Sequence, residues 1–284
     1  TDNIYAPSRQ YCDRVLKRFG VETTYFPPMI GADIERLMRP ETKLVFTESP
    51  GSQTFEVQDV PAIAAAARRH GAYTLMDNTW ATPLFFRPFE HGVDVSVHAG
   101  TKYVVGHSDA MMGLVTYKGE VGKQLDAGVK DLGCPAGPDD CWLALRGLRT
   151  MGVRLKQHEQ AGLEVARWLE TRPEVTRVLH PALPSCPGHD VFTRDFLGSS
   201  GLFGFVMQPG SKAALAAMLD PMELFGMGYS WGGYESLLIP TRPHRTAAAW
   251  ADPGQAMRIH VGLEDPADLV HELEAGFARL RDAV

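Results

Sequence analysis

The hydrophobic and polar positions in the first half of the chain alternate between strand-like and helix-like segments. A segment at residues 60–69 is alanine-rich, has Pro61 near its start and is followed by Gly71, which is typical of a helix. Short runs rich in β-branched and aromatic residues surround it at 43–47, 73–76, 93–98 and 111–117. Strands that alternate with helices predict an α/β fold with a largely parallel sheet.

The second half of the chain has a different pattern after about Gly152. A long amphipathic stretch at 155–169 predicts a helix that connects two domains. Strand-like runs at 175–179, 202–207 and 257–261 then mix with helix-like runs at 212–219 and 267–280 and with a loop at 181–188. This mixture predicts a smaller α+β domain. We therefore expect a large domain over residues 1–150 and a small domain over residues 151–284 that includes the connecting helix.

Composition and charge argue against several classes of protein. The net charge is −6, and no run of lysine or arginine is long enough to indicate a nucleic-acid or acidic-membrane partner. No run of about 18 apolar residues predicts a membrane span. The four cysteines, at positions 12, 134, 141 and 186, lack the spacing of a metal site. We expect them to be reduced thiols of a cytoplasmic protein without a bound metal.

Candidate chemistry lies at the ends of the predicted strands, where open α/β sheets bind ligands. Polar residues follow three of these strands as the pairs 48–49, 77–78 and 101–102. A lysine such as Lys102 more often extends to solvent from a strand end. If it is instead desolvated, its pKa falls and its amine becomes a nucleophile that can form a Schiff base.

Asp77 gives Lys102 a chemical partner. Taken alone, Asp77 would be explained as a residue that caps the next helix. A Schiff-base lysine together with a carboxylate that pairs with a protonated pyridine nitrogen is a recurring requirement of pyridoxal phosphate chemistry, in which the ring acts as an electron sink. The order of a strand ending in aspartate and then a strand ending near lysine favours that interpretation.

Longer motifs carry a resemblance to a known family. The segment MDNTWATPLFFRPFEHGVDVSVHAGTKYVVGHSDAMMG at 76–113 resembles the cofactor-binding core of the Cys/Met-metabolism family of pyridoxal phosphate-dependent enzymes. GYSWGGYESL at 228–237 and RIHVGLED at 258–265 resemble its C-terminal half. The β-lyase branch is the most similar, because Ser52-Gln53 replaces the asparagine-proline pair of the γ-branch enzymes and Trp231 precedes the paired glycines.

The resemblance implies a fold and a function. The fold would be a three-layer α/β/α large domain that binds pyridoxal phosphate, with a smaller C-terminal α+β domain. The activity would be a carbon–sulfur β-lyase in methionine biosynthesis that converts L-cystathionine into homocysteine, pyruvate and ammonia. A γ-lyase, γ-synthase or cysteine-desulfhydrase activity of the same family stays open. The family also implies a homotetramer built as a dimer of dimers.

The resemblance assigns four residues to the cofactor. Lys102 would hold it covalently and then move the Cα proton of the substrate, and Asp77 would pair with its pyridine nitrogen. Tyr5 would stack on its ring, although without the resemblance this residue would be interpreted as a core aromatic. Thr101 would contact the phosphate. Ala99 stands where related enzymes often have a second phosphate-binding serine, so that contact is not expected here.

Four further residues would bind the substrate. Arg258 would clamp the α-carboxylate, a bidentate task that suits a guanidinium group. Ser230, Trp231 and Tyr229 would line the same carboxylate site. By themselves, Ser230 and Trp231 would be explained as a turn residue and a packing residue.

Two family features are absent from this sequence. A glycine-bearing loop that binds the phosphate, and a tyrosine and arginine that reach the neighbouring subunit, would both precede Thr1. We expect that a missing N-terminal segment carries them in the intact protein. The alternative is an inactive fragment or scaffold that lacks the phosphate-binding loop.

Overall fold

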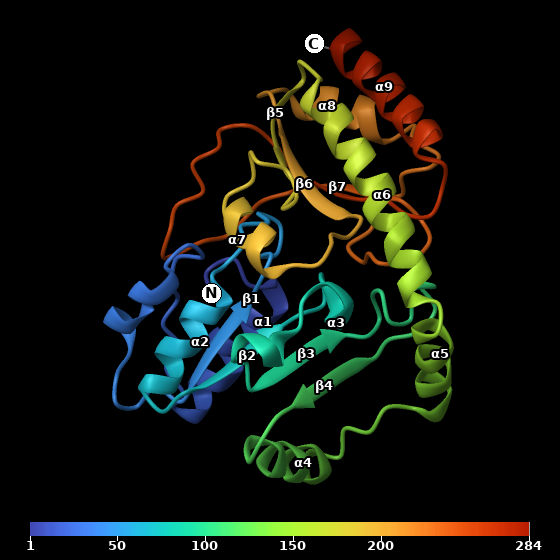
Figure 1. The fold of residues 1–284 in the computed structure, drawn as a ribbon. Helices are drawn as coiled ribbons and strands as arrows, with labels where there is room; N and C mark the ends of the chain where they lie inside the picture. The colour runs from blue at the N-terminus through green and yellow to red at the C-terminus, as the bar shows by residue number, and fades with distance from the viewer. Residues whose placement is uncertain (284) are drawn as a thin grey trace.

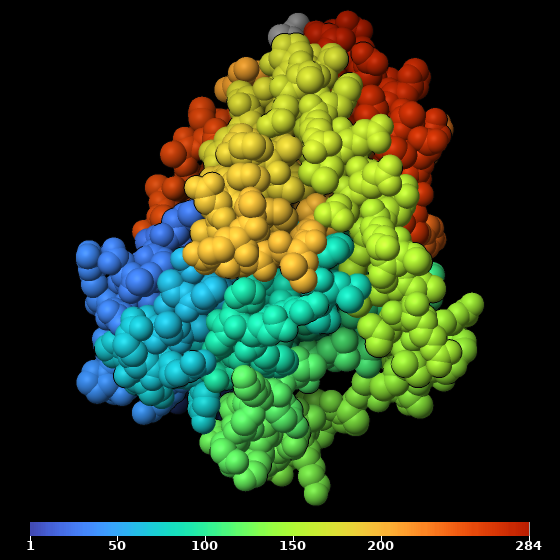
Figure 2. Space-filling model, in the orientation of Figure 1, coloured from blue at the N-terminus to red at the C-terminus, as the bar shows by residue number. Residues whose placement is uncertain are grey.

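The computed structural model describes residues 1–283 of the chain, which form two four-stranded sheets surrounded by helices. Figure 1 shows the sheet of β1 to β4 at one end of the molecule and β5, β6 and β7 towards the other, with the long helix α6 running past both. Figure 2 shows the surface, from which the green segment that contains helix α4 projects at the bottom. Within residues 1–283, no helix is long and apolar enough to cross a membrane.

The first sheet is an α/β sheet with strand order β1-β2-β3-β4. Its strands are β1 Leu44–Glu48, β2 Tyr73–Asp77, β3 Val95–Ala99 and β4 Gly113–Tyr117. The first three strands are parallel, as the sequence predicted, whereas β4 is antiparallel to β3. Only the turn that contains Lys102 separates β3 from β4. That connection holds no crossover helix, which two parallel strands require, so β4 returns alongside β3.

Helix α2, Val60–Arg69, forms the crossover between β1 and β2 and confirms the predicted helix. It begins where the side chain of Asp59 accepts a hydrogen bond from the backbone N–H of Ala62 at 3.1 Å, because the first turn of a helix has no internal partner for that group. Its buried face places Ile63 against Val45 of β1. Burial of one such side chain stabilises the fold by about 1.5–3 kcal/mol.

The second sheet is entirely antiparallel, with strand order β5-β6-β8-β7. Its strands are β5 Val175–Leu179, β6 Leu202–Met207, β7 Leu237–Thr241 and β8 Ala256–His260. The sequence predicted three of these strands and missed β7, which contains Pro240. Because β7 lies at the edge of the sheet, one side of its backbone needs no ladder hydrogen bond, and a proline is tolerated there.

Three helices pack against the second sheet. They are α6 Met151–Glu170, α8 Lys212–Leu219 and α9 Pro266–Asp282, close to the predicted positions. Leu169 of α6, Met218 of α8 and Phe277 of α9 are completely buried in one cluster with Phe205 of β6. The remaining α-helices are α1 Ala6–Gln10, α3 Thr82–Phe85, α4 Val121–Leu132, α5 Pro138–Leu148 and α7 His189–Asp195. Short 3₁₀ or π turns cover Tyr11–Val15, Leu16–Phe19, Gly31–Leu37 and Pro88–His91.

The two halves of the chain share a buried cluster. Trp80 packs edge-on against Phe192 and Phe196, with ring centroids 6.3 Å apart in each pair. Its indole N–H donates a hydrogen bond of 2.7 Å to the carbonyl of Leu202, the first residue of β6. This contact joins the loop after β2 to the second sheet. The division into domains at residue 150 stays a prediction.

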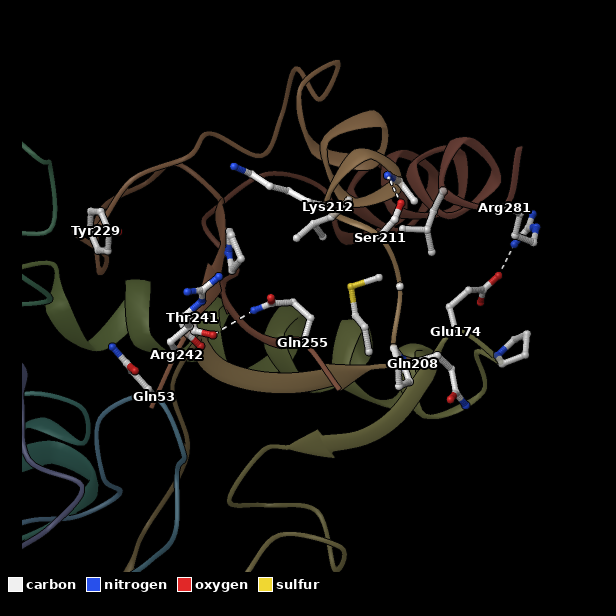
Figure 3. Close-up of a pocket in the computed structure, with 18 residues that line it drawn as sticks. Gln53, Glu174, Gln208, Ser211, Lys212, Tyr229, Thr241, Arg242, Gln255 and Arg281 are labelled. Carbon is white, nitrogen blue, oxygen red and sulfur yellow. Dashed lines mark hydrogen bonds and ion pairs between the residues drawn. The ribbon is translucent and has the colours of Figure 1, made fainter. Parts of the chain in front are cut away.

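A cavity of about 850 Å³ opens beside the second sheet. Figure 3 shows Tyr229 at one end of it and the ion pair between Glu174 and Arg281 at the other. Ser211 and Lys212, at the start of α8, form part of its wall. Lys102 and Asp77 are not among the described residues that line it. The cavity therefore reaches the predicted substrate-binding residues at Tyr229 but does not contain the lysine or the aspartate.

Candidate active site

Lys102 lies in the tight turn that follows β3. Its backbone N–H donates to the carbonyl of Ala99 at 2.9 Å, and its own carbonyl accepts from Gly106 at 2.7 Å. Its Nζ atom donates a hydrogen bond of 2.8 Å to the hydroxyl of Ser230 and lies 5.4 Å from the ring centroid of Trp231. The predicted lysine and two of its predicted neighbours therefore meet across the two halves of the chain.

The environment of Lys102 raises the neutral fraction of its amine. Burial lowers the pKa of Lys102 to about 8, and the nearby positive charge of Arg258 acts in the same direction, while Asp77 opposes it. At pH 7 roughly a tenth of the amine would be neutral, against less than a thousandth for an unperturbed lysine. A neutral amine is the nucleophilic form, so this lysine is suited to attack a carbonyl carbon.

Asp77 ends β2, and its carboxylate is held in one orientation. One of its oxygens, Oδ1, accepts hydrogen bonds from the backbone N–H of Thr79 at 2.9 Å and from the hydroxyl of Thr79 at 2.5 Å. The Thr79 hydroxyl accepts in turn from the N–H of Ala99 at 2.9 Å. Burial raises the pKa of Asp77, although Thr79 and the charge of Lys102 act against that rise. A positively charged partner would therefore stabilise the carboxylate.

A second carboxyl group, that of Glu48, stands beside Asp77. The two residues are paired in register at the ends of the parallel strands β1 and β2. Oε2 of Glu48 accepts a hydrogen bond of 2.7 Å from the backbone N–H of Tyr5. Burial, and next the charge of Asp77, raise the pKa of Glu48 well above its ordinary value. The sequence placed Glu48 at a strand end but did not identify it as a site residue.

Arg258 extends from β8 towards the turn that carries Tyr229. Its Nη2 atom donates to the carbonyl of Tyr229 at 2.8 Å and makes a longer bond of 3.4 Å to Gly228. Burial lowers the pKa of Arg258 to about 10, opposed by the phenols of Tyr5 and Tyr229, so the guanidinium remains charged at neutral pH. Within residues 1–283, its Nη1 and Nε atoms have no hydrogen-bond partner. They are therefore available to a carboxylate.

The remaining predicted residues differ in how they are held. Tyr229 is 83% exposed, and Tyr5 is 48% exposed although its backbone is fixed by Glu48. The hydroxyl of Thr101 accepts a hydrogen bond of 2.9 Å from the backbone N–H of Met112 and so ties the start of β4 to the Lys102 turn. The phosphate-binding role of Thr101 and the stacking role of Tyr5 stay predictions.

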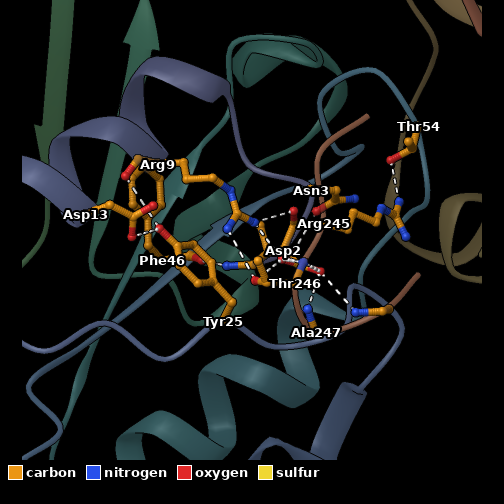
Figure 4. A network of polar contacts seen from close by, with 12 residues as sticks. Asp2, Asn3, Arg9, Asp13, Tyr25, Phe46, Thr54, Arg245, Thr246 and Ala247 are labelled. Carbon is orange, nitrogen blue, oxygen red and sulfur yellow. Dashed lines mark hydrogen bonds and ion pairs between the residues drawn. The ribbon is translucent and has the colours of Figure 1, made fainter. Parts of the chain in front are cut away.

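The segment that carries Tyr5 is anchored by Asp2, which is completely buried. Figure 4 shows its carboxylate between Arg9 and the segment of Thr246 and Ala247. Burial alone would raise the pKa of Asp2, but hydrogen bonds from the backbone of Thr246, Ala247 and Ala248 and from Arg9 outweigh it and lower the pKa to about 2. The first residues of the chain are thereby attached to the loop that precedes β8.

Comparison with known proteins identifies the class to which this site belongs. The model of the family described as Cys/Met metabolism PLP-dependent enzyme matches residues 1–278. The cystathionine β-lyases of Escherichia coli (strain K12) and Salmonella typhimurium (strain LT2) are 47% and 46% identical to the chain, over 99% of its length and 73% of theirs. A relative from Rhizobium johnstonii is 52% identical over 98% of the chain and 71% of its own length, and its provisional name states the same activity.

The chain belongs to the Cys/Met metabolism family of pyridoxal phosphate-dependent enzymes. This membership confirms the resemblance seen in residues 76–113. The protein is accordingly an enzyme that acts on a small amino-acid substrate, and its cofactor is pyridoxal 5′-phosphate.

The residues of the site fit this cofactor. The Lys102 amine, with its pKa near 8, suits a covalent bond to an aldehyde carbon. The Asp77 carboxyl has a raised pKa and would be stabilised by a protonated pyridine nitrogen. Among residues 1–283, no group of three histidine, cysteine, aspartate or glutamate side chains is arranged to hold a metal ion.

Proposed function

We propose that this protein is a carbon–sulfur β-lyase that converts L-cystathionine and water into homocysteine, pyruvate and ammonia. The observation that carries the proposal is the grouping of Lys102, Asp77 and Arg258 within a chain nearly half identical to named cystathionine β-lyases. In the reaction the Cα proton is removed, the Cβ–sulfur bond breaks, and the sulfur leaves as a thiol after taking up a proton. Water then hydrolyses the released enamine to pyruvate and ammonia.

The amine of Lys102 has two proposed roles, to hold the cofactor and to act as the general base. The bound cofactor supplies an electron sink for the carbon next to the substrate amino group. Lys102 would hold the cofactor, and its neutral amine would accept the Cα proton of the substrate. General base catalysis of this kind is most effective when the pKa of the base lies near the working pH, as a pKa of about 8 does. The hydroxyl of Ser230 orients the amine through the 2.8 Å hydrogen bond.

Arg258 would hold the substrate, and Asp77 would hold the cofactor. Arg258 binds the substrate α-carboxylate through the guanidinium nitrogens that Tyr229 and Gly228 leave free. Asp77, which Thr79 keeps in place, would pair with the pyridine nitrogen and favour its protonated form. Tyr5 would stack on the ring.

Three further residues complete the proposed site. The side chains of Trp231 and Tyr229 close the carboxylate end, and the hydroxyl of Thr101 contacts the phosphate. We propose as well that the first sheet is the centre of a three-layer α/β/α domain over residues 1–150, that residues 151–284 form the small domain, and that the enzyme is a homotetramer.

The products formed from cystathionine test this proposal. We expect the purified protein, supplied with pyridoxal phosphate, to release pyruvate and a thiol, and a Lys102→Ala variant to lose at least about a hundredfold of that rate. Borohydride reduction followed by peptide mass analysis should place the pyridoxyl group on the Lys102 peptide. Formation of 2-oxobutyrate instead of pyruvate would show γ-elimination and contradict the proposal. Binding of the cofactor without either product would indicate a different substrate.

A further inference from the structure

His260 is a buried residue of β8 to which neither the motifs nor the proposed mechanism assigns a role. It is 1% exposed and lies two positions after Arg258 on the same strand. Alternate residues of a strand face the same side, so both side chains point to the same face of the sheet. On that face they contact the turn at residues 228–236, which carries Ser230 and Trp231.

The imidazole of His260 holds this turn at two points. The backbone N–H of Gly232 lies 3.1 Å from Nε2, and the carbonyl of Glu235 lies 3.1 Å from Nδ1. Since the Gly232 N–H is a donor, Nε2 must be the unprotonated acceptor, and Nδ1 therefore carries the hydrogen that Glu235 accepts. Burial also holds the pKa of His260 well below its ordinary value, and the neutral ring with this tautomer persists at physiological pH.

The same turn lies directly against the backbone of Lys102. Gly232 has a φ of +81°, and a Cβ atom there would come within 3.0 Å of the Cα of Lys102. A Cβ atom on Gly233 would lie 2.1 Å from the hydroxyl of Ser108, which donates a 3.0 Å hydrogen bond to Glu235. A shift of the turn of even 1 Å would therefore move Ser230 relative to the amine of Lys102.

We propose that His260 is a positioning residue, whose two hydrogen bonds to Gly232 and Glu235 hold Ser230 within reach of the Lys102 amine. The inference rests on the proposed function only in so far as it assigns a catalytic purpose to that arrangement. Tyr103 and His158 pack against the imidazole, with ring centroids 6.1 Å and 5.2 Å away, and keep it in place.

Hydrogen exchange of the backbone amides in residues 228–236 tests the proposal without cofactor or substrate. The variant His260→Phe keeps a ring of similar size and removes both hydrogen bonds. The matched control is His158→Phe, because His158 belongs to the same ring cluster but bonds to the carbonyl of Val261 at 2.9 Å rather than to the turn. We expect exchange in this peptide to be at least about tenfold faster in His260→Phe and unchanged in His158→Phe.

A kinetic comparison separates positioning from general stability. We expect His260→Phe to lower kcat/KM for cystathionine about tenfold more than His158→Phe when both are assayed below their melting temperatures. Equal exchange of the turn in the wild type and in His260→Phe would overturn the proposal, as would equal effects of both variants on exchange. A wild-type protein without lyase activity would instead refute the proposed function and leave the exchange result valid.

Two shorter substitutions keep the test decisive if His260→Phe fails to fold. His260→Gln places an acceptor oxygen near the Gly232 N–H. His260→Asn places a donor near the Glu235 carbonyl, but its side chain is too short to reach the Gly232 N–H. We expect the Gly232 amide to stay protected in the glutamine variant and to exchange faster in the asparagine variant. The opposite order would overturn the assignment of the two hydrogen bonds.

Discussion

The amine of Lys102 and the hydroxyl of Ser230 lie 2.8 Å apart, although 128 positions separate them in the sequence. Lys102 is held by the first sheet, and Ser230 by the turn that β8 of the second sheet supports. The hydrogen bond therefore exists only when both halves of the chain are folded against each other. A change in the contact between the halves should consequently alter the environment of the Lys102 amine.

The pH dependence of cofactor attachment should report the lowered pKa of Lys102. Below a pKa of about 8 the neutral fraction of the amine rises roughly tenfold per pH unit, and above it the fraction becomes constant. We expect the attachment rate, followed by visible absorbance after adding pyridoxal phosphate to the stripped protein, to level off near pH 8. A rate that keeps rising beyond pH 10 would mean that the lysine is not desolvated.

Replacement of Arg258 by lysine should weaken substrate binding more than turnover. An ammonium group keeps the charge but cannot bond a carboxylate in a bidentate manner and at the same time donate to the carbonyl of Tyr229. Loss of charge-assisted hydrogen bonds worth about 1.5–3 kcal/mol predicts that the KM for cystathionine rises by about 10- to 150-fold. Steady-state kinetics measure this, and an unchanged KM would exclude Arg258 from carboxylate binding.

Removal of the Asp2 charge should destabilise the fold. Asp2→Asn leaves the buried Arg9 without its ion pair, which is expected to lower the free energy of unfolding by about 3 kcal/mol. Because the pKa of Asp2 is about 2 in the folded chain and near 4 when unfolded, its stabilising effect is present at neutral pH and is lost as the pH falls from 4 towards 2. The variant should lack this acid-dependent loss.

Urea unfolding of Asp2→Asn needs an exposed ion pair as its control. Glu22 bonds to Arg39 at 2.8 Å with both side chains at least half exposed, so Glu22→Gln should change stability by less than about 1 kcal/mol. Equal unfolding midpoints for the two variants would contradict a structural role for Asp2.

Two glycine-to-alanine substitutions should have opposite effects. A Cβ atom on Gly147 of α5 would lie 2.2 Å from the carbonyl oxygen of Val105, in the segment that follows Lys102, and the backbone cannot yield cheaply. We expect Gly147→Ala to destabilise the protein by about 3 kcal/mol. Gly128 of α4 has no other atom within 4 Å of such a Cβ, and Gly128→Ala should stabilise by up to about 1 kcal/mol. Thermal unfolding of both variants measures the difference.

The bounds of most elements followed from the sequence because local patterns control them. Helix α2 has a capping aspartate and an amphipathic face, and β1, β2, β5 and β6 are short runs of branched and aromatic residues whose burial any folded state requires. The strand β7 and the antiparallel direction of β4 were not predicted. Position in the sheet made Pro240 tolerable, and a short connection determined the direction of β4.

The sequence by itself also indicated the residues that we propose carry the chemistry. Lys102, Asp77 and Arg258 could be identified because they match family motifs, although Lys102 and Asp77 taken alone have common structural explanations. Their family was then confirmed.

Only the tertiary structure decided how those groups are held. It placed Glu48 beside Asp77 and joined Ser230 to Lys102 by a hydrogen bond. It also hydrogen-bonded both ring nitrogens of His260 to the backbone of the turn at 228–236. No local pattern encodes these contacts, because each depends on how two distant segments pack. Burial in that packing is also what lowers the pKa of Lys102, so the increased neutral fraction of its amine is a property of the fold and not of its sequence neighbours.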